Sequence, residues 1–224
     1  MFTRSVFGSA LLLSALGACA SGEDLATREK TSALNVPVAL SGTVHTTARS
    51  GAAGTQHIVG TASSDTYALW GISGKETGAF TNVPCWAHIK TENVNDINDE
   101  VGHNEDQCGS SSPTDGSLLV ADFANTDFTG ERAFVSGAQV CLNSDDTRVK
   151  GWILYGRQIN ANGSLMDLDL DALAGPRPNC DTWKQRIDCP AGEIATAAVL
   201  EFDSGSTPRA WKGISLKCRA VTVQ

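Results

Sequence analysis

The sequence predicts an all-β fold whose sheets are built from repeated hairpins. Residues 134–156 and 194–218 share one pattern: an alternating apolar run, a polar tip of Asp, Ser and Thr, a Lys-Gly pair and a second alternating run. Alternation is typical of strands with one buried face, and helix signals are poor throughout. The 22 glycines are spread in turns such as Ser41-Gly42 and Asn162-Gly163. Because such a hairpin cannot bury its apolar face alone, the repeats are expected to stack on one another.

The first 18 residues predict a signal peptide. One basic residue, Arg4, precedes a short apolar stretch at residues 10–16, which is too short to be a stable membrane span. Residues 16–19 read LGAC and resemble a bacterial lipobox, in which the cysteine, here Cys19, becomes the lipidated first residue. The alternative is ordinary cleavage after Ala20, which leaves a free secreted protein. Both interpretations predict export. Only the lipobox interpretation attaches the protein to a membrane, and it does so through the lipid alone.

Residues 19–35 are polar and mixed in charge, which predicts a flexible tether between the lipid and the domain. Residues 36–224 are long enough for a single all-β repeat domain with a sizeable core. The net charge is −8, and an acidic surface repels phosphate backbones. We therefore expect no nucleic-acid partner.

Six cysteines remain once Cys19 is set aside. An even number in an exported chain predicts three disulfides. We expect neighbours in order to pair, above all Cys189 with Cys218, because that bridge ties the start of the last repeat to its end. Metal ligation is the weaker interpretation, since no C-x-x-C pair occurs. The six are Cys85, Cys108, Cys141, Cys180, Cys189 and Cys218.

Strands are expected where apolar residues alternate, around residues 36–44, 118–120, 140–142, 153–155, 199–202 and 214–218. A third copy of the hairpin is predicted at residues 57–74, and three units allow three sheets to close around one core. Residues 85–116 are rich in Asp, Asn and Glu and predict a long acidic loop stapled by Cys85 and Cys108. Residues 168–174 fit either a short helix or a strand.

Two stretches together resemble the vitelline membrane outer layer protein I family. One is residues 145–154, DDTRVKGWIL; the other runs from Trp183 through CPAG at 189–192 to WKGISLKC at 211–218. The last unit also resembles dermatopontin faintly, through Arg209, Trp211 and Cys218. The resemblance covers about residues 132–221 and implies a β-prism of three sheets with pseudo-threefold symmetry.

The resemblance implies binding rather than catalysis, because β-prisms of this and similar kinds often hold saccharides and the vitelline members are extracellular coat components. We therefore expect an exported, lipid-anchored binding module of the cell envelope, at the outer membrane or cell surface, with glycan as the leading ligand class. One alternative is a structural coat protein without a small ligand. The other is a carbohydrate-active enzyme.

Stacking on a sugar requires a tryptophan beside polar groups on a loop. Trp86, at the foot of the acidic loop, fits this requirement best, and Trp70 and Trp183 follow. Asp99 and Glu100 are the expected polar partners. The remaining pair, Trp152 and Trp211, adjoins the repeated glycines and is expected to pack between sheets.

Catalytic and metal motifs are missing from the sequence. It contains no His-Glu-x-x-His, no P-loop and no Gly-x-Ser-x-Gly elbow, so we expect no enzyme, no metal centre and no cofactor. The alternative is Ca²⁺ bound by the carboxylates of the acidic loop, but the regular Ca²⁺ spacing is absent and a solvated loop is favoured. These carboxylates are Asp96, Asp99, Glu100, Glu105 and Asp106.

A second acidic pattern lies at residues 167–171, where Asp167, Asp169 and Asp171 alternate with Leu168 and Leu170. On a strand the three carboxylates would share one face and the two leucines would face the core. This pattern is typical of an edge strand whose charges deter pairing with other chains. A glycosidase would instead need two carboxylates at a set separation across a cleft.

Overall fold

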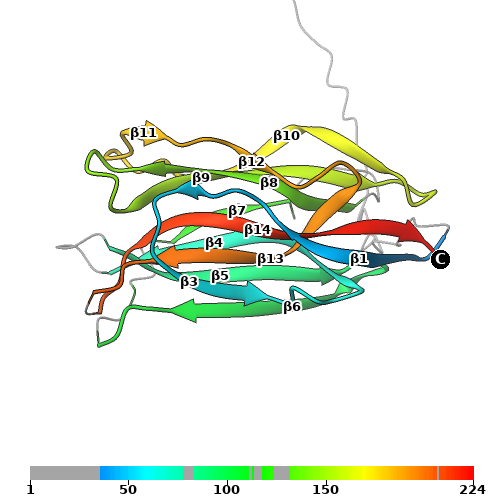
Figure 1. Cartoon of the computed structure of the whole chain (residues 1–224), viewed down its shortest axis with the longest axis horizontal. Helices are drawn as coiled ribbons and strands as arrows, with labels where there is room; N and C mark the ends of the chain where they lie inside the picture. The colour runs from blue at the N-terminus through cyan, green and yellow to red at the C-terminus, as the bar shows by residue number, and fades with distance from the viewer. Residues whose placement is uncertain (1–35, 78–82, 111–112, 114–117, 124–131, 206) are drawn as a thin grey trace, which may run out of the picture.

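A computed structural model of the chain describes residues 36–77, 83–110, 113, 118–123, 132–205 and 207–224. The predicted signal peptide, Cys19 and the tether lie outside these residues. The described elements are all strands (Figure 1). Within the described ranges no helix has the length and apolar character that crossing a membrane requires.

The strands form three antiparallel sheets. The first sheet has the order β1 (Val38–Thr46), β14 (Trp211–Val223), β13 (Glu193–Phe202) and β3 (Thr55–Gly60), with β2 (Ser50–Gly51) also on β14. The second has β10 (Leu165–Ala174), β9 (Val149–Ile159), β8 (Arg132–Leu142) and β11 (Thr182–Trp183), with β12 (Ile187–Asp188) also on β8. The third has β6 (Asp96–Asp106), β5 (Pro84–Asn93), β4 (Tyr67–Glu76) and β7 (Leu119–Asp122).

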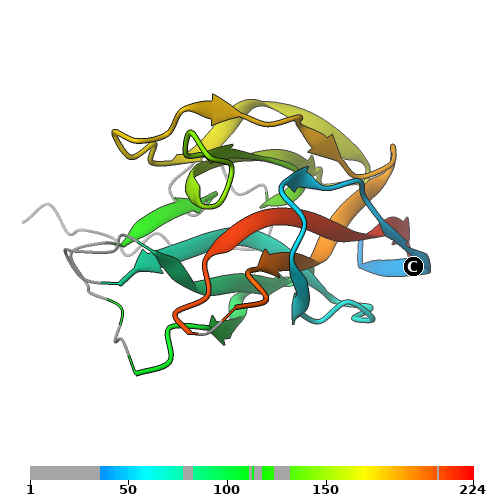
Figure 2. The same ribbon diagram turned by 60° about the vertical axis from the view of Figure 1, so that its left-hand side comes forward.

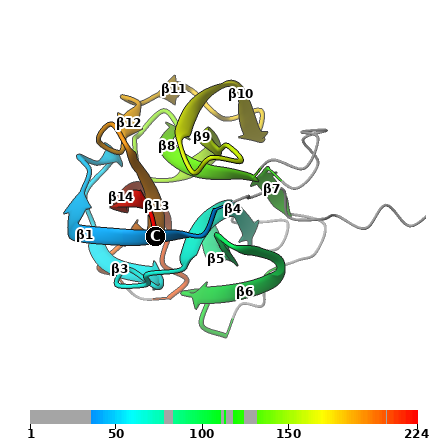
Figure 3. The ribbon, with the colours of Figure 1, turned by 90° about the vertical axis from the view of Figure 1, so that its right-hand side faces the viewer.

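Each sheet is centred on one hairpin: β13–β14, β8–β9 or β4–β5. The turned view separates the sheet that contains β8 to β12 from the other two (Figure 2). A view from the side shows the three sheets as walls around one interior (Figure 3). The predicted all-β, three-sheet β-prism is therefore confirmed, and the two repeats at 134–156 and 194–218 are the central hairpins of two of its walls.

The third repeat was predicted at the wrong place. Residues 57–74 hold β3 and most of β4, and these two strands belong to different sheets because β3 pairs with β13. A turn between the two strands leads the chain from one sheet to the other. In this turn the Ser64 amide donates a hydrogen bond to the Thr61 carbonyl, and the Ser64 hydroxyl accepts one from the Tyr67 amide. The third hairpin consists of β4 and β5 instead.

The predicted acidic loop at 85–116 is also wrong over most of its length, since β5 and β6 occupy residues 84–106. Along β5 the residues Cys85, Ala87 and Ile89 are buried, so the alternation of a strand was present in the sequence. The polar composition of β6 reflects its place at the edge of the sheet, where backbone pairing to β5 proceeds whatever the side chains.

Residues 168–174, left open between helix and strand, belong to β10. A shift of register between Asp167 and Asp171 breaks the simple alternation. Beyond it Ala172 and Ala174 are buried, whereas Leu173 is 51% exposed. The side chains of residues 168–170 lie outside the description, so the predicted core role of Leu168 and Leu170 stays a prediction.

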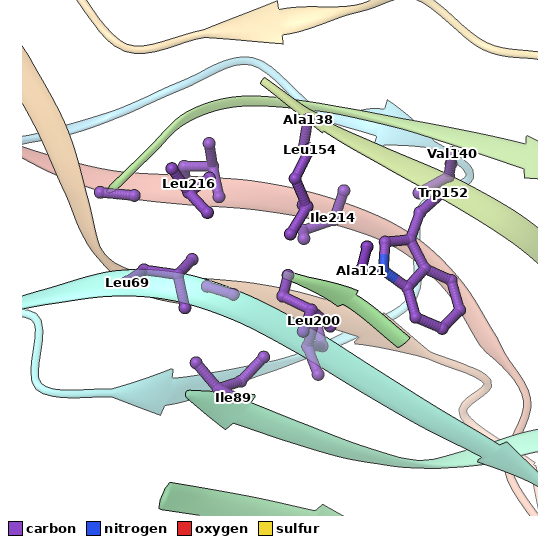
Figure 4. Close-up of a cluster of buried hydrophobic side chains, with 14 of the residues drawn as sticks. Leu69, Ile89, Ala121, Ala138, Val140, Trp152, Leu154, Leu200, Ile214 and Leu216 are labelled. Carbon is purple, nitrogen blue, oxygen red and sulfur yellow. The ribbon is translucent and has the colours of Figure 1, made fainter. Parts of the chain in front are cut away.

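The core lies where the three sheets face one another. Leu69 and Ile89 come from the β4–β5 sheet, Leu154 from β9, and Leu200 and Ile214 from β13 and β14 (Figure 4). All five are almost wholly buried. A second buried cluster, with Leu40, Trp70, Phe134 and Ile159 among its members, also includes Val38 at the start of β1.

Three disulfides brace the walls: Cys85–Cys108, Cys141–Cys180 and Cys189–Cys218. The expected pairing of neighbours in order is confirmed. Each bridge restricts the unfolded chain and contributes about 2–4 kcal/mol of stability.

Candidate functional site

The candidate site lies on the outer face of the β4–β5 sheet. Trp86, His88 and Lys90 alternate with the buried residues of β5 and are only partly buried themselves. Residues opposite one another in an antiparallel pair share a face. Trp86 pairs with Asp106, His88 with Asn104, Lys90 with Gly102 and Glu92 with Glu100 on β6, and Lys75 of β4 pairs with Trp86. We call this surface the outer face; it comprises Lys75, Trp86, His88, Lys90, Glu92, Glu100, Gly102, Asn104 and Asp106.

A shallow hollow of about 140 Å³ opens on the outer face. It is lined by Trp70, His88, Lys90, Thr91, Glu100, Val101 and Gly102. Two predicted site residues, Trp70 and Glu100, therefore meet in one hollow. Gly102 makes room for the imidazole, because a Cβ at this position would lie 2.3 Å from Cε1 of His88.

The indole of Trp86 is held in a fixed orientation on this face. Its ring stacks on that of His88, with 5.8 Å between centroids and 5° between planes. The Nζ atom of Lys75 lies 5.0 Å from the Trp86 ring centroid, and Nδ1 of His88 lies 2.7 Å from Oδ1 of Asn104. The aromatic pair is thus arranged before any ligand arrives, with the Asn104 amide and the Lys75 ammonium beside it and Asp106 opposite Trp86 on β6.

Trp70 forms the inner wall of the hollow. It is the additional residue at a β-bulge between Leu69 and Gly71, and such bulges re-aim side chains. The residue is 7% exposed. Nζ of Lys90 lies 4.9 Å from the Trp70 ring centroid and 2.5 Å from Oδ2 of Asp122. Nε1 of Trp70 has no hydrogen-bond partner among the described residues. The atom is buried, and leaving a buried donor unpaired costs stability.

Two other predicted site residues lie elsewhere. Asp99 accepts a hydrogen bond of 2.5 Å from the Tyr67 hydroxyl and one of 3.1 Å from Asn93. The bond from Tyr67 and then the bond from Asn93 lower the pKa of Asp99, while the same contact raises the pKa of Tyr67. Trp183 lies in the β8–β9 sheet, opposite Cys141. Neither residue lines the hollow.

Sequence reasoning missed His88, Lys90, Gly102 and Asn104. A signal for the first two existed, because residues 85–90 alternate between apolar and polar positions. Treating this stretch as a loop concealed that His88 and Lys90 share a face with Trp86. No local pattern marks Gly102 and Asn104, which acquire their role from the register between β5 and β6.

The carboxylates of β6 are spread along the strand rather than gathered. Oε1 of Glu105 lies 2.9 Å from Nδ1 of His57, and Asp106 accepts a hydrogen bond from the Cys108 amide. In the part of the chain that the structure describes, no three His, Cys, Asp or Glu side chains gather as a metal site requires. The predicted binding of Ca²⁺ stays a prediction. Burial, followed by the charge of His88, lowers the pKa of His103 on the same strand, which favours a neutral ring.

No protein-family model matches the sequence, and no curated protein matches it either. Among solved structures the chain is similar to Calsepa lectin in complex with a biantennary N-glycan, with 10% identity over 80% of this chain and 99% of that one and a TM-score of 0.49. It is also similar to Calystegia sepium agglutinin, with 9% identity, coverage of 79% and 97%, and a TM-score of 0.47.

A third similar structure is the V. cholerae biofilm matrix protein Bap1, with 12% identity over 86% of this chain but 26% of that one, and a TM-score of 0.37. At such identities a likeness concerns the fold alone. The resemblances to the vitelline membrane outer layer protein I family and to dermatopontin stay predictions.

Proposed function

We propose that the protein is a carbohydrate-binding module and that glycan binds on the outer face of the β4–β5 sheet. The observation that carries this proposal is the partly buried Trp86, oriented by His88 and Lys75, beside a hollow lined by Trp70 and Glu100. A pyranose ring has an apolar C–H face and a rim of hydroxyls. It therefore needs an aromatic surface next to hydrogen-bonding groups, which is the combination that this face offers.

The polar groups of the face suit hydroxyl ligands. Glu100 and Asn104 can accept hydrogen bonds from sugar hydroxyls, and Lys90 can donate to them. The hollow is shallow, and Glu100 is the single carboxylate among its described lining residues. A glycosidase needs two carboxylates flanking the bond to be cleaved. Binding without hydrolysis is therefore the function that this geometry supports best.

We further propose that the module is exported and attached to the cell envelope through a lipid on Cys19. Support comes from the three disulfides, which persist in oxidising compartments. The sequence adds the apolar leader and its LGAC ending. Mass spectrometry of the mature N-terminus tests the anchor: a diacylglyceryl group on Cys19 supports it, and an unmodified N-terminus after Ala20 contradicts it.

A glycan array with the exported Cys19→Ala protein tests the binding proposal. We expect selective glycan binding that Trp86→Ala weakens by roughly tenfold or more. Stacking of a nucleic-acid base on an aromatic side chain contributes about 1–3 kcal/mol, and we apply the same scale to a sugar ring on the indole. Trp183→Ala is the matched control, because it removes a partly exposed tryptophan from another sheet. Binding to no glycan, with or without Ca²⁺, overturns the proposal and favours a structural coat protein.

A further inference from the structure

A second hollow, larger than the first, lies between two other walls of the prism. It has a volume of about 360 Å³ and is formed by β9, the turn that leads into β10, the turn before β13 and the end of β14. Its volume falls within the range of about 300–1,000 Å³ that is typical of small-molecule sites. No residue of this hollow belongs to the outer face described above.

Arg157 supplies a fixed set of donors to this hollow. Its Nε donates to Oδ1 of Asp167 at 2.6 Å, and its Nη1 donates at 2.7 Å to the carbonyls of Pro190 and Glu193. The side chain is only 13% exposed. A guanidinium has five N–H donors, and the two on Nη2 have no partner within the described ranges. The guanidinium of Arg157 is thus held rigidly, and the N–H groups of its Nη2 atom remain to donate to a ligand.

Asp167 supplies the complementary acceptor. Its side chain is 80% exposed, and Oδ2 makes no hydrogen bond to any residue that the structure describes. Gly192, which also lines the hollow, has a left-handed φ of 80°, and nothing lies within 4 Å of where its Cβ would be. The half-buried side chains of Leu165 and Val221 add apolar surface to the lining.

We infer that this hollow is a second ligand site, which takes a neutral ligand rich in hydroxyls, such as a terminal monosaccharide with vicinal hydroxyl groups. A hydroxyl can accept from Arg157 and at the same time donate to Asp167, so one hydroxyl or an adjacent pair satisfies both. An anion would be repelled by Asp167, and a cation by Arg157. The C–H face of the sugar ring would cover Leu165 and Val221. The site is independent of the outer face, and only the ligand class connects it with the proposed function.

Titration of the ¹⁵N-labelled, disulfide-intact protein with the methyl glycosides of glucose, galactose and mannose tests this inference. We expect at least one sugar to shift the amide signals of Gly163, Ser164 and Gly192, which line the hollow. Asp167→Ala removes a charged acceptor and should weaken this binding by roughly tenfold. Asp171→Ala is the control, because it removes an exposed carboxylate of the same strand outside the hollow.

The two sites give separate readouts in the same titration, because Gly102 and Asn104 report on the outer face. Shifts of Gly192 that persist in Trp86→Ala support an independent second site, even if the outer face binds nothing. The inference is overturned if none of the sugars moves the signals of the second hollow at the highest soluble concentration. Equal weakening by Asp167→Ala and Asp171→Ala overturns it too.

Discussion

The indole of Trp152 lies against that of Trp211, with 5.0 Å between ring centroids and 53° between planes. One residue comes from β9 and the other from β14, so two walls of the prism meet here. The third wall reaches the same point through Gly74 of β4. A Cβ on Gly74 would lie 2.8 Å from Cη2 of Trp152 and 3.6 Å from Cζ3 of Trp211. All three central hairpins therefore touch at one position in the core.

Gly74→Ala should destabilise the protein by about 1–3 kcal/mol, because an added methyl overpacks this contact. The backbone has little freedom to retreat, since Gly74 is paired with Ala87 on one side and Leu119 on the other. Urea unfolding measures the loss. Gly205→Ala is the control, because nothing lies within 4 Å of that Cβ position. Equal stability of the two variants would contradict tight closure at Gly74.

The two hairpins that the sequence analysis identified have both strands close together in the chain. Residues 134–156 and 194–218 each contain an apolar run, a polar tip and a second apolar run, so the local sequence pattern is sufficient to predict each hairpin. β3 could not be assigned this way. Its partner β13 lies about 140 residues away, and Ile58 is 59% exposed while Val59 is buried. Pairing between such distant segments leaves no mark in the local sequence.

The candidate site was likewise predictable only where its residues lie close together in the sequence. Trp86 and Glu100 were selected because a tryptophan and carboxylates occurred in one polar stretch, and both lie on the outer face. Trp70 was selected as a second tryptophan, and only the bulge in β4 brings it beside Lys90. Asp99 neighbours Glu100 in sequence but bonds Tyr67 instead. Adjacent residues of a strand point to opposite faces, so proximity in sequence was misleading there.

The contact between Tyr67 and Asp99 predicts a pH-dependent contribution to stability. The pKa of Asp99 is lower in the folded protein than its ordinary value, because the hydrogen bond from Tyr67, and then that from Asn93, favours the carboxylate. The stabilisation is therefore present above the ordinary pKa of an aspartate and is lost as the pH falls through the lower folded value. We expect Asp99→Asn to be less stable than the wild type at neutral pH.

Thermal unfolding across pH measures this difference, which should vanish under strongly acidic conditions. Tyr67→Phe is the companion variant, because it removes the principal donor and leaves the carboxylate in place. A stability difference between Asp99→Asn and wild type that stays constant from neutral to acidic pH would show that the contact does not act in this way.

The Cys85–Cys108 bridge joins β5 to the segment that follows β6. Both cysteines are almost wholly buried, together with Val83 and Ala210. The double variant Cys85→Ala/Cys108→Ala should lose about 2–4 kcal/mol, because the unfolded chain regains the freedom that the bridge removes. Urea unfolding without reductant measures the loss, and non-reducing peptide mapping checks the three pairings. A double variant as stable as the wild type would contradict this account.

Lys150 and Glu76 form a buried ion pair between two sheets, with Nζ of Lys150 2.8 Å from Oε1 of Glu76. Their side chains are 1% and 7% exposed, and Nε of Arg177 lies 3.4 Å from the other carboxylate oxygen. Replacing one partner of such a pair leaves a charge in the core that has lost its main counter-charge. We expect Lys150→Met to cost about 3 kcal/mol in urea unfolding.

Replacing both partners, as in Lys150→Met/Glu76→Met, removes the buried charges together, so this variant should be more stable than Lys150→Met alone. The exposed pair of Lys184 with Asp146, at 2.6 Å, is the matched control. Lys184→Met should cost less than about 1 kcal/mol, because water screens that pair and solvates the remaining carboxylate. The burial argument fails if Lys150→Met costs no more than Lys184→Met, or if the second substitution in the core makes the protein still less stable.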